Sequence, residues 1–175
     1  CARAIKRAAR RTRTSSRMTP TTTQQQTDVV IIGLEVRVAP HEVFTKLPQL
    51  WARFAQQGVA VTPRAQDPGV YAVYCDYERD AAAPYTVVLG HAVEASTEVP
   101  VGLRRVRIPA GRYARFEVKG PPQQTLGAAW GFINGAWPEK SSRRFIADAE
   151  RYLAPPAADG SIHAEVLVGV DFTPA

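Results

Sequence analysis

The chain has 175 residues, enough for one domain with a hydrophobic core and too few for two large domains. Its formal net charge of +6 is unevenly placed, because residues 1–17 hold seven of the 22 Lys and Arg residues and no acidic residue. The rest of the chain has 15 basic and 16 acidic residues, a net charge of −1, and this near-neutral composition gives no support for nucleic-acid binding by the folded part.

The first 27 residues are predicted to be a disordered tail, and residues 28–175 the folded domain. The basic stretch 1–17 is compatible with three interpretations: an arm that contacts DNA or membrane, a targeting peptide, or upstream sequence that is not part of the mature protein. Met18, which follows directly, favours the last interpretation. Residues 19–27, TPTTTQQQT, are a polar low-complexity linker that we do not expect to pack.

Cysteine usage and hydropathy indicate the compartment only indirectly. Cys1 lies in the tail and Cys75 in a predicted strand, so no disulfide framework is indicated and a reducing cytoplasm is the simplest location. No apolar run approaches the roughly 18 residues of a membrane-spanning helix, and no signal-peptide core is recognisable. We therefore predict a cytoplasmic domain without membrane association.

The folded part begins with a strand and an amphipathic helix. Residues 28–38, DVVIIGLEVRV, are β-branched and mostly apolar, as expected of a buried strand. Over residues 41–57, apolar side chains recur at spacings of four and three, which predicts a helix ended by Gly58. Pro48 conflicts with an uninterrupted helix, so we expect regular helix to start at this proline after a looser turn.

Residues 70–77 and 85–94 are predicted to form a hairpin. Both stretches are rich in β-branched and aromatic residues, and a charged loop separates them. Along the first strand, Tyr71 and Tyr74 fall on opposite faces. Gly90, inside the second strand, indicates a β-bulge or the close approach of another backbone or a ligand.

The second half repeats this outline. Residues 106–118 are predicted to be a strand with a turn signal at Pro109-Ala110-Gly111, and residues 123–137 an amphipathic helix halted by a following proline. Residues 145–153 are predicted to be a short helical piece and residues 163–172 a final strand. The order predicts an α+β domain in which helices cover an antiparallel sheet, with two similar halves related by a pseudo-twofold and a crevice between them.

Common catalytic motifs are missing from the sequence. There is no nucleophile elbow, no phosphate-binding glycine loop, no dinucleotide fingerprint and no zinc motif. His41, His91 and His163 lack the spacing of metal ligands, so we predict no metal site and no cofactor.

Aromatic residues and carboxylates remain as candidates for a site. They are Tyr71, Tyr74, Tyr113, Trp130, Trp137 and Tyr152, with Glu117, Glu150 and Glu165. An aromatic box with a buried carboxylate is a known way to hold a lipophilic cation, because the ring quadrupole and the negative charge both attract it. The alternative is that Trp130 and Trp137 are only the core stripe of their helix.

Several segments together resemble a known family. IPAGRYARFEVKGP, AAWGFINGAWPE, ADAERYL and HAEVLVGV, preceded by PGVYAVYCDYERD and APYTVVLGHAV, are similar to the GyrI-like effector-binding domain of AraC- and MerR-type transcription regulators, which also occurs in stand-alone proteins. The resemblance spans residues 29–172. It implies two β-α-β-β modules, a curved antiparallel sheet with helices on one side, and a central pocket for hydrophobic, often cationic, small molecules.

The resemblance also implies which residues bind the ligand. Glu150 and Tyr152 match the Glu-x-Tyr motif of the family, Trp137 its tryptophan before the Pro-Glu turn, and Tyr113 its Gly-x-Tyr strand. Glu165 falls on the acidic position that opens the last strand.

A final binding candidate is Tyr71, which opens the paired middle strands.

Two positions depart from the family pattern. Ala149 stands where an aromatic residue is common, and Gly169 where a proline is common. Residues 1–27 are too few for the DNA-binding helix-turn-helix, so we expect a stand-alone member, closest in form to the integron-associated and gyrase-inhibitor-like ones.

Three functions follow as hypotheses. The first is a sensor or sequestering protein for hydrophobic cations, linked to transcription regulation and leaving room for a separate regulatory protein partner. The second is a hydrolase of electrophilic small molecules, with Glu150 as base and Tyr113 or Tyr152 as proton donor. The third is a gyrase-inhibitor-like protein-interaction module, which the near-neutral composition does not favour. We expect binding without catalysis.

Overall fold

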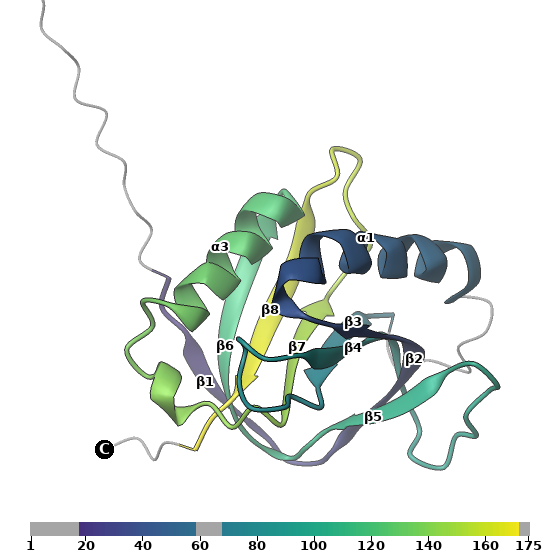
Figure 1. Cartoon of the computed structure of the whole chain (residues 1–175), viewed down its shortest axis with the longest axis horizontal. Coiled ribbons are helices and arrows are strands. Elements are labelled where there is room, and N and C mark those ends of the chain that lie inside the picture. Colours follow the sequence, from purple (N-terminus) through teal and green to yellow (C-terminus); the bar gives the residue numbers. More distant parts are fainter. Residues whose placement is uncertain (1–17, 59–67, 172–175) are drawn as a thin grey trace, which may run out of the picture.

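The structure is a computed structural model that describes residues 18–58 and 68–171. An eight-stranded antiparallel sheet carries its helices on one face (Figure 1). The strands are β1 (Thr21–Gln25), β2 (Val29–Val38), β3 (Val70–Cys75), β4 (Tyr85–Val93), β5 (Arg104–Ile108), β6 (Gly111–Gly120), β7 (Ala147–Tyr152) and β8 (Ile162–Gly169). The helices are α1 (Val43–Arg53) and α3 (Pro122–Asn134), with short helical turns at Pro40–Glu42, Phe54–Gly58 and Lys140–Ser142.

Two β-α-β-β units build the domain, β2-α1-β3-β4 and β6-α3-β7-β8. The strand order is β1-β6-β8-β7-β3-β4-β2-β5, so corresponding strands lie symmetrically on either side of the central antiparallel pair β3 and β7. A pseudo-twofold axis therefore passes between β3 and β7. The predicted α+β class and its two-module arrangement are confirmed.

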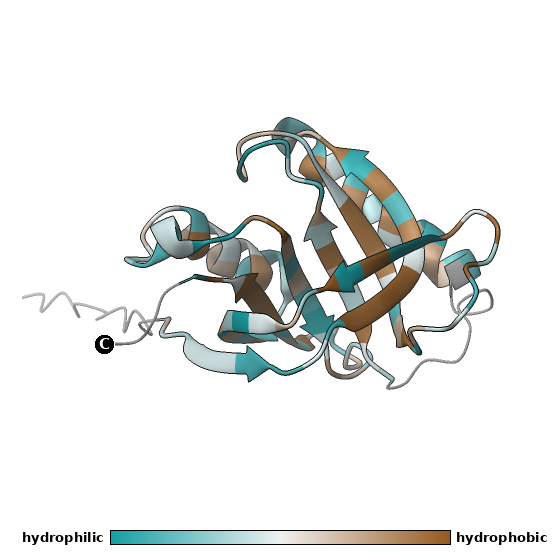
Figure 2. Cartoon of the chain, turned by 90° about the horizontal axis from the view of Figure 1, so that it is seen from below, coloured by the Kyte–Doolittle hydropathy of each residue, from teal (hydrophilic) through white to brown (hydrophobic). Residues whose placement is uncertain are grey.

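The period of two along each strand sends side chains to both faces of the sheet, and each face has its own core. On the helix-covered face, Ile133 of α3 packs in one cluster with Phe116, and Leu50 of α1 packs in another with Leu89. On the opposite face, β5 folds back toward β3 and β7, and its Ile108 closes a third cluster. Figure 2 shows the sheet from this side, with hydrophobic residues running along its strands.

Gly33 and Gly90 face each other in the β2–β4 pair. A Cβ atom on Gly90 would lie 2.0 Å from the carbonyl oxygen of Ile32, and one on Gly33 would lie 2.0 Å from that of Leu89. No side chain fits such a gap. The close backbone approach predicted for Gly90 is confirmed, and the bulge is not needed because the register continues through both glycines.

Pro48 lies inside α1 and does not begin it, so that prediction was wrong. A short turn at Pro40–Glu42 leads into the helix, which starts at Val43. Proline removes the N–H that would bond the carbonyl of Phe44. The Phe44 side chain is highly exposed, so the helix borders solvent at this turn.

The predicted helical piece at residues 145–153 is a strand instead. Ala147–Tyr152 forms β7, which pairs with β3 on one side and β8 on the other. Alanine and glutamate favour helices, but two neighbouring strands offer their backbone groups here, and small residues alternate with large polar ones as a strand requires. Tertiary pairing therefore overrides local propensity.

Two further segments differ from the predictions. The strand expected at residues 106–118 is divided after Ile108, and its first part pairs with β2 while its second part begins at Gly111. Gly111 has a φ of +144°, which lets the chain turn sharply from one sheet edge toward the other. The segment 19–27, expected not to pack, contributes β1, which pairs with β6.

The other predicted elements are present with shifted ends. The hairpin of β3 and β4 is formed, α3 ends at Asn134, and the final strand is β8. Cys1 and the basic stretch 1–17 lie outside the described residues. Among the helices of the described part, none is long and apolar enough to cross a membrane.

Candidate functional site

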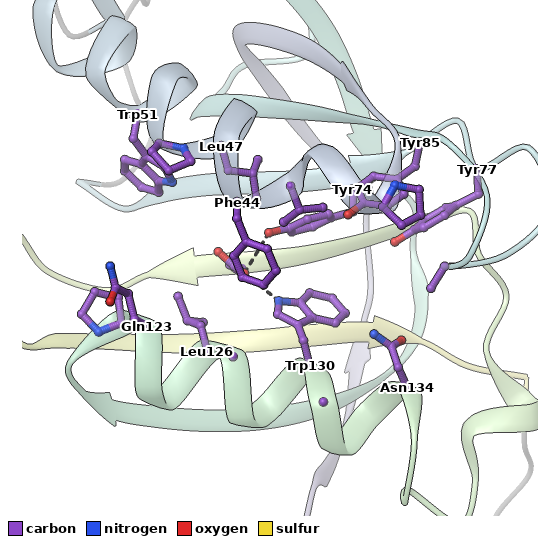
Figure 3. A pocket seen from close by; sticks show the side chains of 18 of the residues that line it. Phe44, Leu47, Trp51, Tyr74, Tyr77, Tyr85, Gln123, Leu126, Trp130 and Asn134 are labelled. Atoms are coloured by element: carbon purple, nitrogen blue, oxygen red, sulfur yellow. Dashed lines mark hydrogen bonds between the residues drawn. The ribbon is translucent and has the colours of Figure 1, made fainter.

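A cavity of about 780 Å³ opens between α1 and α3 (Figure 3). Tyr74 of β3 contributes to its floor together with Glu150 and Tyr152 of β7. The walls are mainly apolar and aromatic, and include Leu47, Trp51, Tyr77, Tyr85, Leu126 and Trp130. Because β3 and β7 are the central strands, the cavity lies over the pseudo-twofold axis and takes residues from both modules.

Glu150 is buried in this cavity and accepts three hydrogen bonds from aromatic side chains. Its Oε1 atom accepts from the Tyr74 hydroxyl at 2.9 Å and from Trp130 Nε1 at 2.7 Å. Its Oε2 atom accepts from the Tyr152 hydroxyl at 2.7 Å. Within residues 18–58 and 68–171, no Lys, Arg or His forms an ion pair with it. The carboxylate therefore has donors and no counter-charge from the described residues.

Burial and hydrogen bonding act in opposite directions on the pKa of Glu150. Removal from water raises the pKa, and the three donors lower it, with a net rise above the ordinary value. Burial, followed by the nearby carboxylate, raises the pKa of both Tyr74 and Tyr152, so their hydroxyls stay protonated and remain donors. The three donors therefore offset only part of the cost of burying the negative charge of Glu150.

Aromatic rings surround this carboxylate. The Tyr74 and Trp130 rings are 5.0 Å apart and inclined at 59°, and the Trp51 and Tyr152 rings are 4.9 Å apart and nearly perpendicular. Ring faces attract cations by ~0.5 to 2 kcal/mol each. Their density around one acid suits an organic cation better than a metal ion, and in the described part of the chain no cluster of three His, Cys, Asp or Glu is placed to hold a metal.

A second polar group lies in the same cavity at Arg143. Its Nη2 atom forms a buried ion pair of 2.7 Å with Asp148, and its Nη1 atom donates to Oδ1 of Asn134 at 2.6 Å. Asp148 also accepts from the Tyr77 hydroxyl and from the backbone N–H of Gly169. The two buried charges compensate each other, so this end of the cavity carries no net charge.

The rim carries one unusually exposed apolar side chain. Phe44 of α1 is 90% exposed although it borders the cavity. Figure 3 shows its ring in front of the cavity, on the side of Trp130. Water around a phenyl ring is unfavourable, and the ring is placed where a bound ligand would cover it.

The structure brings two of the six sequence-predicted site residues into the cavity, Glu150 and Tyr152. Trp137 lies elsewhere. It is 2% exposed and packs edge-on against Phe116 at 5.4 Å beneath α3, because α3 ends at Asn134 and the following residues turn toward the sheet. The core-stripe alternative considered for this tryptophan matches its position.

The other three predicted residues lie on the opposite face of the sheet. Tyr71 and Tyr113 belong to the core that β5 closes, and the Tyr113 hydroxyl donates to the carbonyl of Pro109 at 2.7 Å. Glu165 forms an ion pair of 2.9 Å with Arg115. The expected crevice shared by these residues and Glu150 is not formed, because their strand positions place them on the other face.

Sequence reasoning underrated the residues that contact Glu150. Tyr74 and Trp130 were among the aromatic candidates without being selected. A signal was available for α3, where Gln123, Leu126, Trp130 and Asn134 follow helical spacing along a different side from the buried Ala129 and Ile133. No local pattern indicated the buried pair formed by Arg143.

Comparison with known proteins decides the family. A family model described as integron-associated effector binding protein matches residues 24–170. The chain belongs to this family. The effector-binding assignment confirms the resemblance seen in the sequence, and it agrees with the ligand-sized cavity between the two modules.

Similar proteins extend this finding. The candidate transcriptional regulator YobU of Bacillus subtilis (strain 168) is 26% identical over 110 residues, which cover 61% of this chain and 68% of YobU. An integron cassette protein from Vibrio cholerae superposes with a TM-score of 0.67 at 20% identity, over 87% of this chain and 96% of that one. SAV2435 bound to tetraphenylphosphonium superposes with a TM-score of 0.69 at 11% identity, over 88% and 94%. At these identities the two structures establish a shared fold.

Proposed function

We propose that this effector-binding protein holds hydrophobic, aromatic cations between α1 and α3 and acts as their sensor or sequestering protein. The observation that carries the proposal is the buried Glu150 carboxylate, which accepts three hydrogen bonds and has no cationic partner among the described residues. A buried charge is costly unless an opposite charge compensates it. A ligand cation would supply that charge, and the surrounding rings would bind its aromatic groups.

Similarities to two other proteins support the proposal. SAV2435, which shares the fold, has been seen with tetraphenylphosphonium, a hydrophobic aromatic cation. The similarity to YobU supports a link with transcription regulation. The near-neutral composition of the folded part gives no support for direct DNA contact by this domain.

Tryptophan fluorescence tests the proposal directly. Trp51 and Trp130 line the cavity, so a bound aromatic cation is expected to change their emission. Tetraphenylphosphonium should bind at least about tenfold more tightly than the neutral triphenylphosphine oxide or the anionic tetraphenylborate, a difference of ~1.4 kcal/mol. Equal affinity for all three compounds would refute the role of charge.

Two variants connect the result to Glu150. Glu150→Gln keeps the side-chain size and removes the charge, so it should lose the preference for the cation. Glu165→Gln is the matched control, since Glu165 lies on the other face of the sheet, outside the cavity. It should bind like the unmodified protein. Thermal unfolding of both variants checks that the fold is kept.

Hydrolysis is a second candidate function, because the pKa of Glu150 is raised and its carboxylate accepts a hydrogen bond from the Tyr152 hydroxyl. A carboxyl group with a raised pKa is a better general base near neutral pH. Tyr113, the other proton donor considered, is placed in the core of the opposite sheet face and does not reach Glu150. Turnover of strained-ring electrophiles that disappears in Glu150→Ala would favour hydrolysis, whereas saturable binding without turnover would favour the sensor.

A further inference from the structure

A second polar position lies in the cavity beyond Trp130. Asn134 is the last residue of α3 and follows Trp130 by one helical turn, about 6 Å along the helix axis. Trp130 donates its Nε1 proton to Glu150, so its indole ring separates the acid from the amide of Asn134. A ligand that spans the ring could therefore contact both positions.

Arg143 determines which end of the Asn134 amide faces the cavity. Its Nη1 atom donates to Oδ1 of Asn134 at 2.6 Å. Because a guanidinium group has only donors, the amide oxygen must face Arg143 and the nitrogen Nδ2 must point elsewhere. Figure 3 shows this nitrogen on the side of Trp130. Within the described ranges 18–58 and 68–171, Nδ2 makes no hydrogen bond.

Arg143 is itself held firmly. Asp148 fixes Nη2, and the ring of Phe145 stacks on the guanidinium at 4.3 Å. Phe145 has a φ of +51°, a conformation that bulky residues rarely adopt and that persists only where surrounding contacts impose it. These contacts hold the Arg143 side chain, and its hydrogen bond orients the Asn134 amide.

The charge balance indicates what kind of group Asn134 would recognise. The Arg143 side chain is 2% exposed and Asp148 is fully buried, and their charges cancel. The exposed donor of Asn134 therefore has a neutral environment. A neutral oxygen matches it, whereas a carboxylate on the ligand would meet no free positive charge here and would be repelled by Glu150.

We propose that Asn134 selects, among hydrophobic cations, those that carry a neutral hydrogen-bond acceptor such as an ester, amide or ketone oxygen. The acceptor would lie about one aromatic ring away from the cationic centre. This inference rests on the proposed function, because Glu150 binds the cationic part of the same ligand. Asn134 acts as a specificity-determining residue, and Arg143 positions it.

Matched phosphonium probes test the selection. Heptyltriphenylphosphonium and the methyl ester of carboxybutyl-triphenylphosphonium have the same cation and side arms of equal length, and only the ester has an acceptor. One neutral hydrogen bond predicts that the ester binds roughly threefold to tenfold more tightly, as measured by calorimetry or tryptophan fluorescence. The free acid should bind more weakly than the ester.

Two substitutions at the exposed end of α3 complete the test. Asn134→Leu keeps the shape and removes the donors, so the affinity ratio of ester to heptyl probe should approach one. Asn134→Asp replaces the donors by an acceptor and should also abolish the preference. The affinity ratio of the two probes is compared within each variant, so an effect of the substitution on cation binding in general cancels.

The outcomes distinguish cation binding from selection by Asn134. If neither probe binds the unmodified protein, the proposed cation-binding function fails, and this inference with it. If both probes bind equally, or the ester preference survives Asn134→Leu, selection by Asn134 is refuted while cation binding stands. Tighter binding of the free acid than of the ester would refute the neutral acceptor.

Discussion

Nε1 of Trp130 donates a 2.7 Å hydrogen bond to Oε1 of Glu150, which joins α3 to the central strand β7. The same oxygen accepts from Tyr74, a residue of the other module. One carboxylate therefore connects both halves of the domain at the pseudo-twofold. A ligand that neutralises this charge would act on the contact between the two modules, and this position makes Glu150 central to the predictions below.

Cation binding should weaken as the pH falls. The pKa of Glu150 is raised by burial, so the carboxylate takes up a proton at a higher pH than an ordinary glutamate, whose pKa is about 4.3. The cation needs the ionised form. Titration with tetraphenylphosphonium from neutral to mildly acidic pH should show affinity falling through the raised pKa. The residual binding of Glu150→Gln should not change over the same interval.

The stability of the ligand-free protein should show the opposite trend. An acid with a higher pKa in the folded than in the unfolded state contributes stability at low pH that is lost as the pH rises through the folded pKa. The melting temperature should therefore decrease across that window in the unmodified protein. Glu150→Gln should show a smaller decrease. Identical pH profiles for the two proteins would contradict a raised pKa.

Loss of Asp148 should destabilise the domain strongly. Asp148→Asn leaves Arg143 buried without a counter-charge, and breaking such a pair costs about 3–5 kcal/mol of unfolding free energy. Urea denaturation measures the loss. Glu78→Gln is the control, because the Glu78–Arg37 pair is exposed and contributes little. Equal effects of the two substitutions would show that burial of the pair is not important.

Gly90→Ala should also be destabilising, by roughly 3 kcal/mol, because its Cβ would collide with the backbone oxygen of Ile32 at 2.0 Å. Backbone cannot move aside as a flexible side chain can. Gly131→Ala provides the contrast, since nothing lies within 4 Å of its Cβ position in α3. Alanine there should stabilise the helix by about 0.5–1 kcal/mol. Tolerance of Gly90→Ala in thermal melts would mean that β2 and β4 separate easily.

Phe44→Ala should reduce ligand affinity without affecting the fold. Its ring is 90% exposed at the cavity rim, so truncation should change the unfolding free energy by less than about 0.5 kcal/mol. Because tetraphenylphosphonium is expected to cover this ring, removing the ring should lower the affinity about threefold to tenfold. Val101→Ala, which removes an exposed side chain outside the cavity, should leave affinity unchanged. Equal affinity of Phe44→Ala and the unmodified protein would show that the ligand does not reach the rim.

Much of the fold follows from local pattern. Alternation and β-branched residues identify β2, β3, β4 and β8, and helical spacing identifies α1 and α3. Gly90 indicated a β-bulge or a close approach of a backbone or ligand, because glycine has no side chain to pack in a strand, and the structure shows the close backbone approach. Strand Ala147–Tyr152 was missed for the converse reason, since its residues favour helix in isolation and only pairing with two neighbours selects the extended form.

The sequence by itself indicated the two modules, and its family resemblance pointed to Glu150 and Tyr152 through a short local motif, along with four residues that lie outside the cavity. Only the tertiary structure decided which aromatic residues join them. The period of two assigns Tyr71 and Tyr74 to opposite faces but does not say which face the helices cover, and packing places Tyr74 beside Glu150. Asn134 and Arg143 meet because the chain turns after α3, a contact that depends on three-dimensional closure and leaves no trace in local spacing.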